Sequence, residues 1–476
     1  MPRPSSTEFP LDNAALEQRL EQDEHEKKAV LAAFAGTVQH FFGGWASLFR
    51  RVADPRMPAL ILYPVVSLAL AGILMYATHL KARRQIGLQL RGNGSSADHF
   101  RTLTGVAACP HGDTVNAAFK RMNPDEFQAI VTGMTETLIR QKVLYRYRLL
   151  ERHFLVVVDG TGRLTFPERH CSHCLTATHG GKTIYYHPVL EAKLVTYDGL
   201  VFSLLTEFIE NPGEFPKKQD CELKAFYRLA ERLKQRFPRL PICLLMDGLY
   251  AGGPTFAVCD KYNWKYIIVL QEKDLSTVHQ EFEALMRLVP ENHLHSLCVP
   301  APSADTVVQQ DLRWANEIAY VDSERQEHTV SVLECLETTR DDDGQPKTTR
   351  FKWVTNFTVT AKRVTTLANE GGRLRWKIDA KREGFNVQKN GGFELEHVYS
   401  HDSTASKIFY FLLQIAHTLL QLVEHGSLFR KVFPAGVGSS KNIAVRLLEA
   451  WRNVRLSLAE WEHCLTAQFQ IRLDTS

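Results

Sequence analysis

Two aspartates in this chain follow short apolar runs, and carboxylates in that position can bind divalent cations. Asp159 follows the run that begins at Phe154, and Asp247 follows the run that begins at Ile242. Each run is continuous, which is typical of a strand buried on both faces. Carboxylates at the ends of neighbouring strands would lie at one edge of a sheet, where α/β folds place their sites. The pair predicts a site that supplies oxygen ligands to Mg²⁺ or Mn²⁺.

A simpler interpretation exists for the same residues. Glycine follows each aspartate, as Gly160 and Gly248, and Asp-Gly is a strong turn signal. On this interpretation the two dipeptides only reverse the chain. The pair and the motifs downstream of it favour the metal site.

Further carboxylates lie in the segment 375–389. If this segment is helical, Asp379 and Glu383 are one turn apart and share a face. Basic side chains surround them: Arg375, Lys377, Lys381, Arg382 and Lys389. Carboxylates among cations suit a site that binds a metal ion and a polyanionic backbone together. The alternative is an ion-paired helix on the surface.

A separate cluster of thiols and imidazoles has the spacing of a zinc knuckle. Cys171 and Cys174 form a Cys-x-x-Cys pair, with His170 beside it and His187 further along the chain. A structural zinc site takes four such ligands at defined spacing. His173 and His179 lie in the same region, so the second ligand pair is irregular. The alternative is a set of buried thiols and surface imidazoles.

The composition is that of a globular protein. The hydrophobic fraction is 44% and the charged fraction 23%, which excludes a disordered chain. A length of 476 residues predicts roughly three domains. The net charge of +4 does not indicate nucleic-acid binding by itself, although basic residues cluster locally. Nine scattered cysteines and a polar, acidic N-terminus without a secretory leader predict a reducing, cytoplasmic location.

One uncharged stretch, 57–80, is long enough to cross a membrane and has basic flanks. Prolines, Gly72 and polar residues interrupt it, and no second span occurs. We therefore expect a buried helix of a helical domain, with a membrane anchor as the alternative.

The pattern along the chain predicts an α/β fold whose mixed sheet is preceded by an all-helical N-terminal domain. Helical periodicity dominates residues 1–150. Strands alternate with helices over 151–299, and alternating strands fill 300–365, with 341–344 as a hairpin tip. A helix is expected to begin near Arg375, and the apolar pattern of Ser406–Glu424 predicts a second helix that packs in a core. The predicted parts are 1–150, 151–299, 300–365, 366–430 and a helical segment 431–476.

Several short motifs occur in the order found in one family. They are Asp159-Gly-Thr, Cys174-Leu, Tyr185-Tyr-His187-Pro-Val-Leu-Glu-Ala, Gln219-Asp-Cys-Glu222, Leu245-Met-Asp247-Gly-Leu, Trp353-Val-Thr355, Arg375-Trp-Lys-Ile, Gly384-Phe-Asn and Leu395-Glu-His397. The chain resembles bacterial insertion-sequence transposases of the DDE type, over about residues 100–425. The resemblance implies an RNase H-like core in two parts, with the first aspartate after the first strand, the second after the fourth, and a β-rich insertion before a helix that bears a glutamate.

The resemblance assigns Asp159 and Asp247 directly and leaves the third carboxylate open. Counting forward from Arg375, the Tyr-Arg-Glu-Lys signature of one branch places its glutamate at Asp379, and its tyrosine at Gly372. Counting back from Gly384, Glu383 is the nearest glutamate. We favour Glu383, with Asp379 as the alternative.

The resemblance implies an enzyme that cleaves and joins DNA at the ends of an insertion sequence with Mg²⁺ or Mn²⁺. Arg375 and Lys389 would contact phosphates of double-stranded DNA in the terminal repeats and the target. A homodimer on DNA and a bacterial, nucleoid-associated location are implied. The alternatives are a related nuclease without strand transfer, or a DNA-binding protein that has lost catalysis. A position of Asp379 or Glu383 within about 6 Å of the Asp159–Asp247 pair would favour the enzymes, and the absence of both from that range would favour the protein without catalysis.

Overall fold

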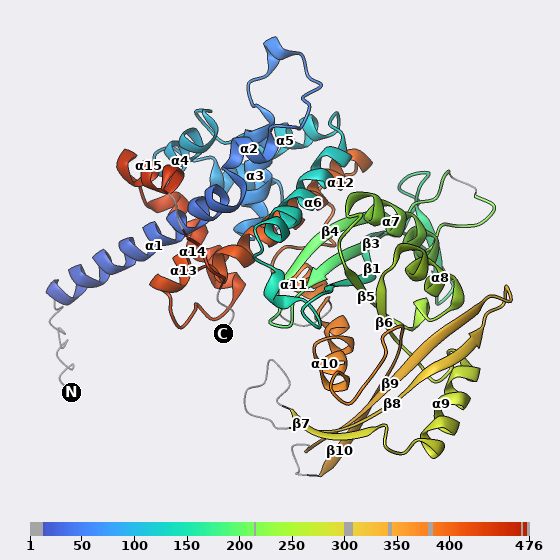
Figure 1. Cartoon of the computed structure of the whole chain (residues 1–476). Helices are drawn as coiled ribbons and strands as arrows, with labels where there is room; N and C mark the ends of the chain where they lie inside the picture. The colour runs from blue at the N-terminus through green and yellow to red at the C-terminus, as the bar shows by residue number, and fades with distance from the viewer. Residues whose placement is uncertain are drawn as a thin grey trace, which may run out of the picture. The chain divides into compact units, whose positions relative to one another are not determined.

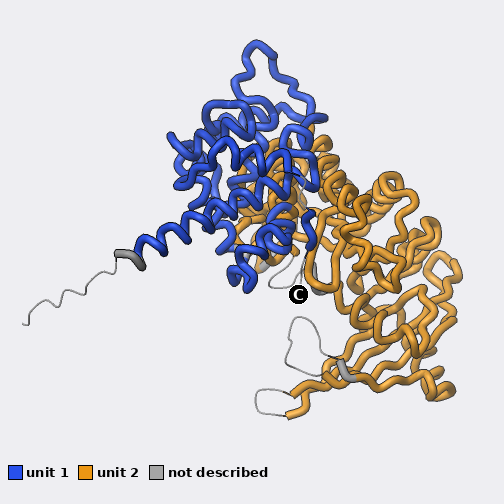
Figure 2. Tube along the Cα trace, turned by 60° about the vertical axis from the view of Figure 1, so that its left-hand side comes forward, with its two compact units in different colours: residues 1–122, 419–474 blue, residues 123–418, 475–476 orange. Residues whose placement is uncertain are grey.

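The structure is a computed structural model that describes residues 13–213, 216–298, 308–340, 345–378, 384–467 and 470–473. Only the backbone is described at 13–15, 179, 297–298, 376–378 and 440. The contacts divide the chain into two compact units, which Figure 2 distinguishes by colour. Unit 1 is Met1–Met122 with Leu419–Asp474, and unit 2 is Asn123–Thr418 with Thr475–Ser476.

Unit 1 is helical and combines both ends of the chain (Figure 1). Its helices are α1 (Asn13–Phe42), α2 (Trp45–Phe49), α3 (Val65–Ala77), α4 (Ser95–Thr104), α5 (Gly112–Phe119), α13 (Ser427–Val432), α14 (Ser440–Asn453) and α15 (Leu458–Thr466), with short turns η1 (Pro58–Leu60) and η2 (Ile86–Leu90). The second half of α1 packs on α13, α14 and α15. It does so with buried residues at helical spacing: Val30, Leu31, Phe34 and Val38.

The uncharged stretch 57–80 is not one helix. Residues Pro58–Leu60 form the turn η1, Pro64 caps α3, and α3 has 13 residues. A span needs about 20 residues. Nearly every residue of α3 is buried, so α3 is the central helix of unit 1, as expected for the buried-helix interpretation. Among the described residues, Ser403–Glu424 is the helix long and apolar enough to cross a membrane, and its most apolar window is 89% buried.

Unit 2 is built on a mixed sheet of ten strands. The strands are β1 (Phe154–Phe166), β2 (Leu175–His179), β3 (Lys182–Val195), β4 (Val201–Phe208), β5 (Ile242–Met246), β6 (Lys265–Val269), β7 (His293–Cys298), β8 (Val308–Val321), β9 (Glu327–Arg340) and β10 (Pro346–Thr355). Its helices are α6 (Pro124–Arg140), α7 (Glu222–Arg236), α8 (Gly253–Tyr262), α9 (Ser276–Leu288), α10 (Val364–Asn369), α11 (Gly384–Asn390) and residues 403–418 of α12 (Ser403–Glu424), with turns η3 (Tyr145–Tyr147), η4 (Gly248–Tyr250) and η5 (Gly372–Ile378).

The strand order is β2-β3-β1-β5-β6-β10-β9-β8-β7, and β4 pairs with β3. The strands β1, β5 and β6 are parallel, and the other pairs are antiparallel. Both apolar runs identified in the sequence form strands: Phe154–Val158 in β1 and all of β5 are buried. The prediction of a mixed α/β sheet after a helical N-terminal region is confirmed.

Two layers cover the sheet. On one face Phe256 of α8 stacks on Tyr266 of β6, with ring centroids 5.0 Å apart. On the other face η5 lies against Ile267 and Trp353. A Cβ on Gly371 would be 2.6 Å from Ile267, and one on Gly372 would be 2.4 Å from Trp353. Only glycine permits this close approach, so the segment before Arg375 lies on the face to which Ile267 belongs.

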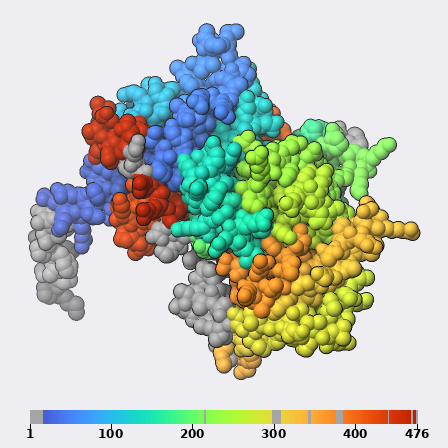
Figure 3. Space-filling model, in the orientation of Figure 1, coloured from blue at the N-terminus to red at the C-terminus, as the bar shows by residue number. Residues whose placement is uncertain are grey.

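The predicted strands of the segment 300–365 are confirmed as β8, β9 and β10. The residues 341–344 expected at a hairpin tip lie outside the described residues, but Arg340 pairs with Pro346 on either side of them. The turn between β8 and β9 projects from unit 2 at the right of Figure 3. The single helix expected from near Arg375 is not found, because η5 is a 3-10 helix and α11 begins at Gly384.

Candidate functional site

Asp159 and Asp247 occupy equivalent positions on neighbouring strands. The parallel pairing of β1 and β5 sets Val157 opposite Leu245. Asp159 lies two residues beyond this pair within β1, and Asp247 lies two residues beyond it, directly after the end of β5, so both belong to the same edge of the sheet. Both carboxylates act on the nearby Tyr250 and help to raise its pKa, although burial is the largest cause. The structure therefore brings the predicted pair together.

The turn interpretation is wrong at Asp159. The strand β1 does not end there but continues to Phe166, with Asp159 opposite Glu191 of β3. At Asp247 the turn interpretation is right about the backbone. The strand β5 ends at Met246, and the Asp247 carboxylate accepts a hydrogen bond from the backbone N–H of Leu249, 2.9 Å away, which caps η4. A capping carboxylate still has a second oxygen available for other partners.

The two glycines are required for close approach. A Cβ on Gly160 would lie 2.3 Å from Oε2 of Glu222, and one on Gly248 would lie 2.7 Å from Oδ2 of Asp274. Neither glycine has the positive φ that would demand glycine for its backbone alone. Because Gly160 and Gly248 have no side chain, the carboxylate of Glu222 can approach the backbone after Asp159, and the carboxylate of Asp274 can approach the backbone after Asp247.

Glu222 is a further carboxylate near Asp247, and sequence reasoning included it in the motif Gln219-Asp-Cys-Glu222 without giving it a role in the site. It is the first residue of α7, and its Oε1 accepts a 2.8 Å hydrogen bond from the Tyr250 hydroxyl. Burial raises the pKa of Glu222, and the charge of Asp247 raises it further, while hydrogen bonds from Tyr250 and from the Gly160 backbone oppose this shift. An acidic residue in a first helical turn normally indicates only a favourable helix dipole, so the sequence signal was weak.

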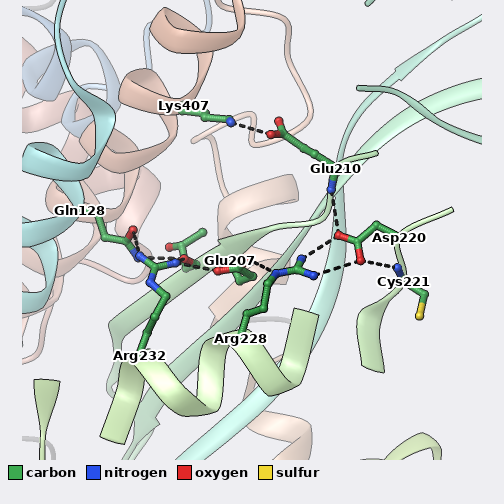
Figure 4. A network of polar contacts seen from close by, with 9 residues as sticks. Gln128, Glu207, Glu210, Asp220, Cys221, Arg228, Arg232 and Lys407 are labelled. Carbon is green, nitrogen blue, oxygen red and sulfur yellow. Dashed lines mark hydrogen bonds and ion pairs between the residues drawn. The ribbon is translucent and has the colours of Figure 1, made fainter. Parts of the chain in front are cut away.

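A polar network holds the start of α7 in place (Figure 4). Asp220 accepts hydrogen bonds from the backbone N–H groups of Glu210 and Cys221, and from the guanidinium of Arg228 at 2.7 Å. Arg228 also pairs with Glu207 of β4. These contacts fix α7 to β4, and Glu222 is two residues beyond Asp220. The network therefore positions the Glu222 carboxylate.

Arg375 provides the opposite charge. Its Nη1 is 3.6 Å from Oδ2 of Asp159, and its side chain is 8% exposed. The predicted phosphate contact would require an accessible guanidinium, whereas this one is buried against the aspartate. Lys389 forms a 2.9 Å ion pair with Glu396 and is partly exposed.

The remaining residues predicted for this site lie outside the described residues. These are Asp379, Lys381, Arg382 and Glu383, and for Lys377 only the backbone is described. The choice between Asp379 and Glu383 as the third carboxylate stays a prediction. In the sequence their segment begins four residues after Arg375, the residue that pairs with Asp159.

We expect Gly160→Ala to lower the free energy of unfolding by about 1 kcal/mol. The new Cβ displaces the end of the flexible Glu222 side chain and breaks its hydrogen bond from Tyr250, which has roughly that net value. Gly162→Ala in the same strand is the matched control, because its Cβ would meet nothing within 4 Å. Urea unfolding should show a smaller loss for Gly160→Ala in a Glu222→Ala background. An equal loss in both backgrounds would contradict the contact.

Cys171, Cys174 and His187 form a group that could hold a metal ion. The Sγ atoms of the two cysteines are 3.6 Å apart, and Nε2 of His187 is 3.4 Å from Cys171 Sγ and 3.2 Å from Cys174 Sγ. Zinc–ligand bonds of about 2.0–2.3 Å in a tetrahedron separate ligand atoms by roughly 3.5 Å, so the three residues fit. Burial lowers the pKa of His187 to about 4, which keeps the imidazole neutral as a ligand must be.

The fourth predicted ligand, His170, is adjacent but engaged elsewhere. Its Nε2 is 2.8 Å from the carbonyl oxygen of His401, and its ring stacks on Phe166. The ring centroids of His170 and His187 are 6.4 Å apart. His173 contacts the carbonyl oxygen of Asn211 instead. The described side chains therefore supply three ligands, and the ring of His170 lies beside that of His187 without joining them.

Comparison with known proteins does not assign the chain. No protein-family model matches it, and no curated protein matches it.

Proposed function

We propose that this chain is a metal-dependent transposase that cleaves DNA at the ends of a mobile element and joins them to target DNA. The observation that supports the proposal is the parallel pairing of β1 and β5, whose last pair, Val157 and Leu245, lies two residues before each aspartate. The order of the strands adds support. If β2 is left aside, β1 is the first strand and β5 the fourth, as the resemblance to DDE transposases expects of an RNase H-like core.

In the proposed site, Asp159 and Asp247 hold Mg²⁺ or Mn²⁺ through carboxylate oxygens. Such ions activate a water or a 3′-hydroxyl and stabilise the leaving oxygen at phosphorus. Glu222 adds a third carboxylate to the edge, and Tyr250 fixes its orientation through the 2.8 Å hydrogen bond. Arg375 offsets the charge of Asp159 and holds its carboxylate in place.

Double-stranded DNA is the proposed partner, through the terminal repeats and the target. The basic residues Lys377, Lys381, Arg382 and Lys389 would contact the phosphate backbone, while Arg375 stays paired with Asp159. A homodimer on DNA and a cytoplasmic, nucleoid-associated location are part of the same proposal.

A second proposal concerns zinc. The fit of Cys171, Cys174 and His187 favours a structural Zn²⁺ that ties the β1–β2 loop to β3. This ion would be distinct in chemistry from Mg²⁺, because thiolate and imidazole ligands select zinc. His170 would complete the tetrahedron if it released the His401 carbonyl.

The proposed activity is tested with duplex DNA that carries the inverted repeats flanking the coding sequence. We expect the wild-type chain to nick this DNA and join it to a target duplex when Mg²⁺ is present, and to do neither in chelator. Denaturing gels follow both products. Cleavage without joining would indicate a nuclease, binding without cleavage would indicate a DNA-binding protein, and cleavage that persists in chelator would reject the metal site.

A further inference from the structure

A second group of metal-type ligands lies far along the sheet, on β7 and β8. Residues at alternate positions of a strand point to the same face, so His293 and His295 share one face of β7. The antiparallel register sets Asp311 of β8 opposite His295 and Arg313 opposite His293. The pleat of two adjacent strands thus brings two imidazoles and one carboxylate to the same face.

The three side chains are in contact range. Oδ1 of Asp311 contacts Nδ1 of His295 and is 3.8 Å from Nε2 of His293. The two imidazole centroids are 4.3 Å apart with planes at 64°. One ligand atom from each residue lies within 4.8 Å of the others. Ligands on one zinc ion are separated by roughly 3–3.5 Å, so small rotations of these partly exposed side chains would close the site.

The nearest basic cluster is largely, but not fully, neutralised. Arg313 is opposite His293 in the register, and its guanidinium pairs with Glu334 and lies 4.0 Å from Glu283 of α9. Arg350 and Lys352 pair with the same two carboxylates, so this cluster keeps one net positive charge, and Asp311 is the ligand that supplies negative charge to a bound cation. The side chains of His293 and His295 are 36% and 68% exposed, so an ion can reach them from solvent.

We propose that His293, His295 and Asp311 bind one divalent transition-metal ion, such as Zn²⁺ or Co²⁺. Two imidazoles with one carboxylate suit these ions and do not suit Mg²⁺, which prefers oxygen ligands throughout. Solvent completes the coordination shell because the site is open. The ion would link β7, the edge strand of the sheet, to β8. The site is separate from the aspartate pair and does not depend on the proposed function.

The test is equilibrium dialysis of the full chain, stripped of metal, against Zn²⁺. We expect wild type to bind one more ion per chain than the variant His293→Ala/His295→Ala, while Ser296→Ala, on the opposite face of β7, binds as wild type. Excess Mg²⁺ should not displace this ion. Equal stoichiometry and affinity in the double variant and wild type would overturn the proposal.

A Co²⁺ titration separates this site from the thiol cluster. Only cysteine ligands give a thiolate-to-cobalt charge-transfer band, so the band should be unchanged in the histidine variant. Loss of the band in that variant would overturn the independence of the two sites.

Circular dichroism checks that the double variant folds. If the double variant does not fold, Asp311→Asn replaces it, with an expected loss of affinity of roughly tenfold or more, since even residues that only support a ligand contribute about that much. Unchanged affinity in Asp311→Asn would reject the site.

Discussion

Asp159→Asn and Asp247→Asn should each reduce Mg²⁺-dependent DNA cleavage by at least about a thousandfold. Metal ions supply several kcal/mol of transition-state stabilisation, and each factor of ten corresponds to about 1.4 kcal/mol. The amide retains the size of the carboxylate and can still accept the hydrogen bonds from Gly160 and Leu249. It removes the negative charge that a cation requires. Cleavage is measured under single-turnover conditions on end-sequence DNA.

Measurements of stability and of DNA binding distinguish a loss of catalysis from a loss of folding in these variants. Asp247→Ala also removes the cap of η4, at a cost of about 1 kcal/mol, whereas Asp247→Asn keeps it. Both variants should be inactive, and only the alanine variant should be less stable. Asp260→Asn, at an exposed position of α8, is the control and should cleave as wild type. Anisotropy should show DNA binding close to wild type in all variants. An active Asp159→Asn or Asp247→Asn would refute the metal role.

The sequence predicted the strands of this site because burial on both faces leaves a continuous apolar run. It could not predict where β1 ends. The residues after Asp159 pair with β3 over a long antiparallel ladder, and pairing between distant segments overrides the local turn signal of Asp159-Gly160. The parallel register of β1 and β5 likewise arises from tertiary structure, and its last pair, Val157 and Leu245, lies two residues before each aspartate.

Glu222 shows what a linear pattern misses. Its carboxylate reaches the site because α7 is anchored to β4 through Arg228 and Glu207, and because Gly160 has no side chain to exclude it. Both conditions depend on residues far apart in the chain. The long apolar stretch of unit 1 is the opposite case, because its own prolines favoured a buried helix, and Pro64 and the turn η1 do restrict α3 to 13 residues.

The thiol cluster was predicted in part. The Cys-x-x-Cys spacing identified Cys171 and Cys174, and His170 and His187 were both predicted as ligands, of which the register brings His187 to the thiols. The strand β2 pairs Leu175 with Tyr186, so the next residues outward, Cys174 and His187, are neighbours. His170 instead stacks on Phe166.

Removal of zinc should destabilise unit 2 substantially. A ligand that binds only the folded state stabilises it by about 4 kcal/mol when its free concentration is a thousand times Kd. We therefore expect the metal-stripped chain to unfold at a lower temperature, and Zn²⁺ to restore the transition. Because the ligands must be deprotonated, the recovery should weaken as the pH falls. Differential scanning calorimetry of the full chain measures both effects.

Cysteine variants assign this stabilisation to the cluster. Cys174→Ser should abolish the zinc-dependent stability that the thiol cluster supplies, together with the thiolate-to-cobalt band. Cys221→Ser is the matched control, because Cys221 is exposed at the start of α7 and lies outside the cluster. It should respond to zinc as wild type does. Since the three ligands connect the β1–β2 loop to β3, loss of the ion should also increase hydrogen exchange in residues 167–175 while leaving β5 protected. A Cys174→Ser chain that Zn²⁺ stabilises as strongly as wild type would show that these thiols do not hold the ion.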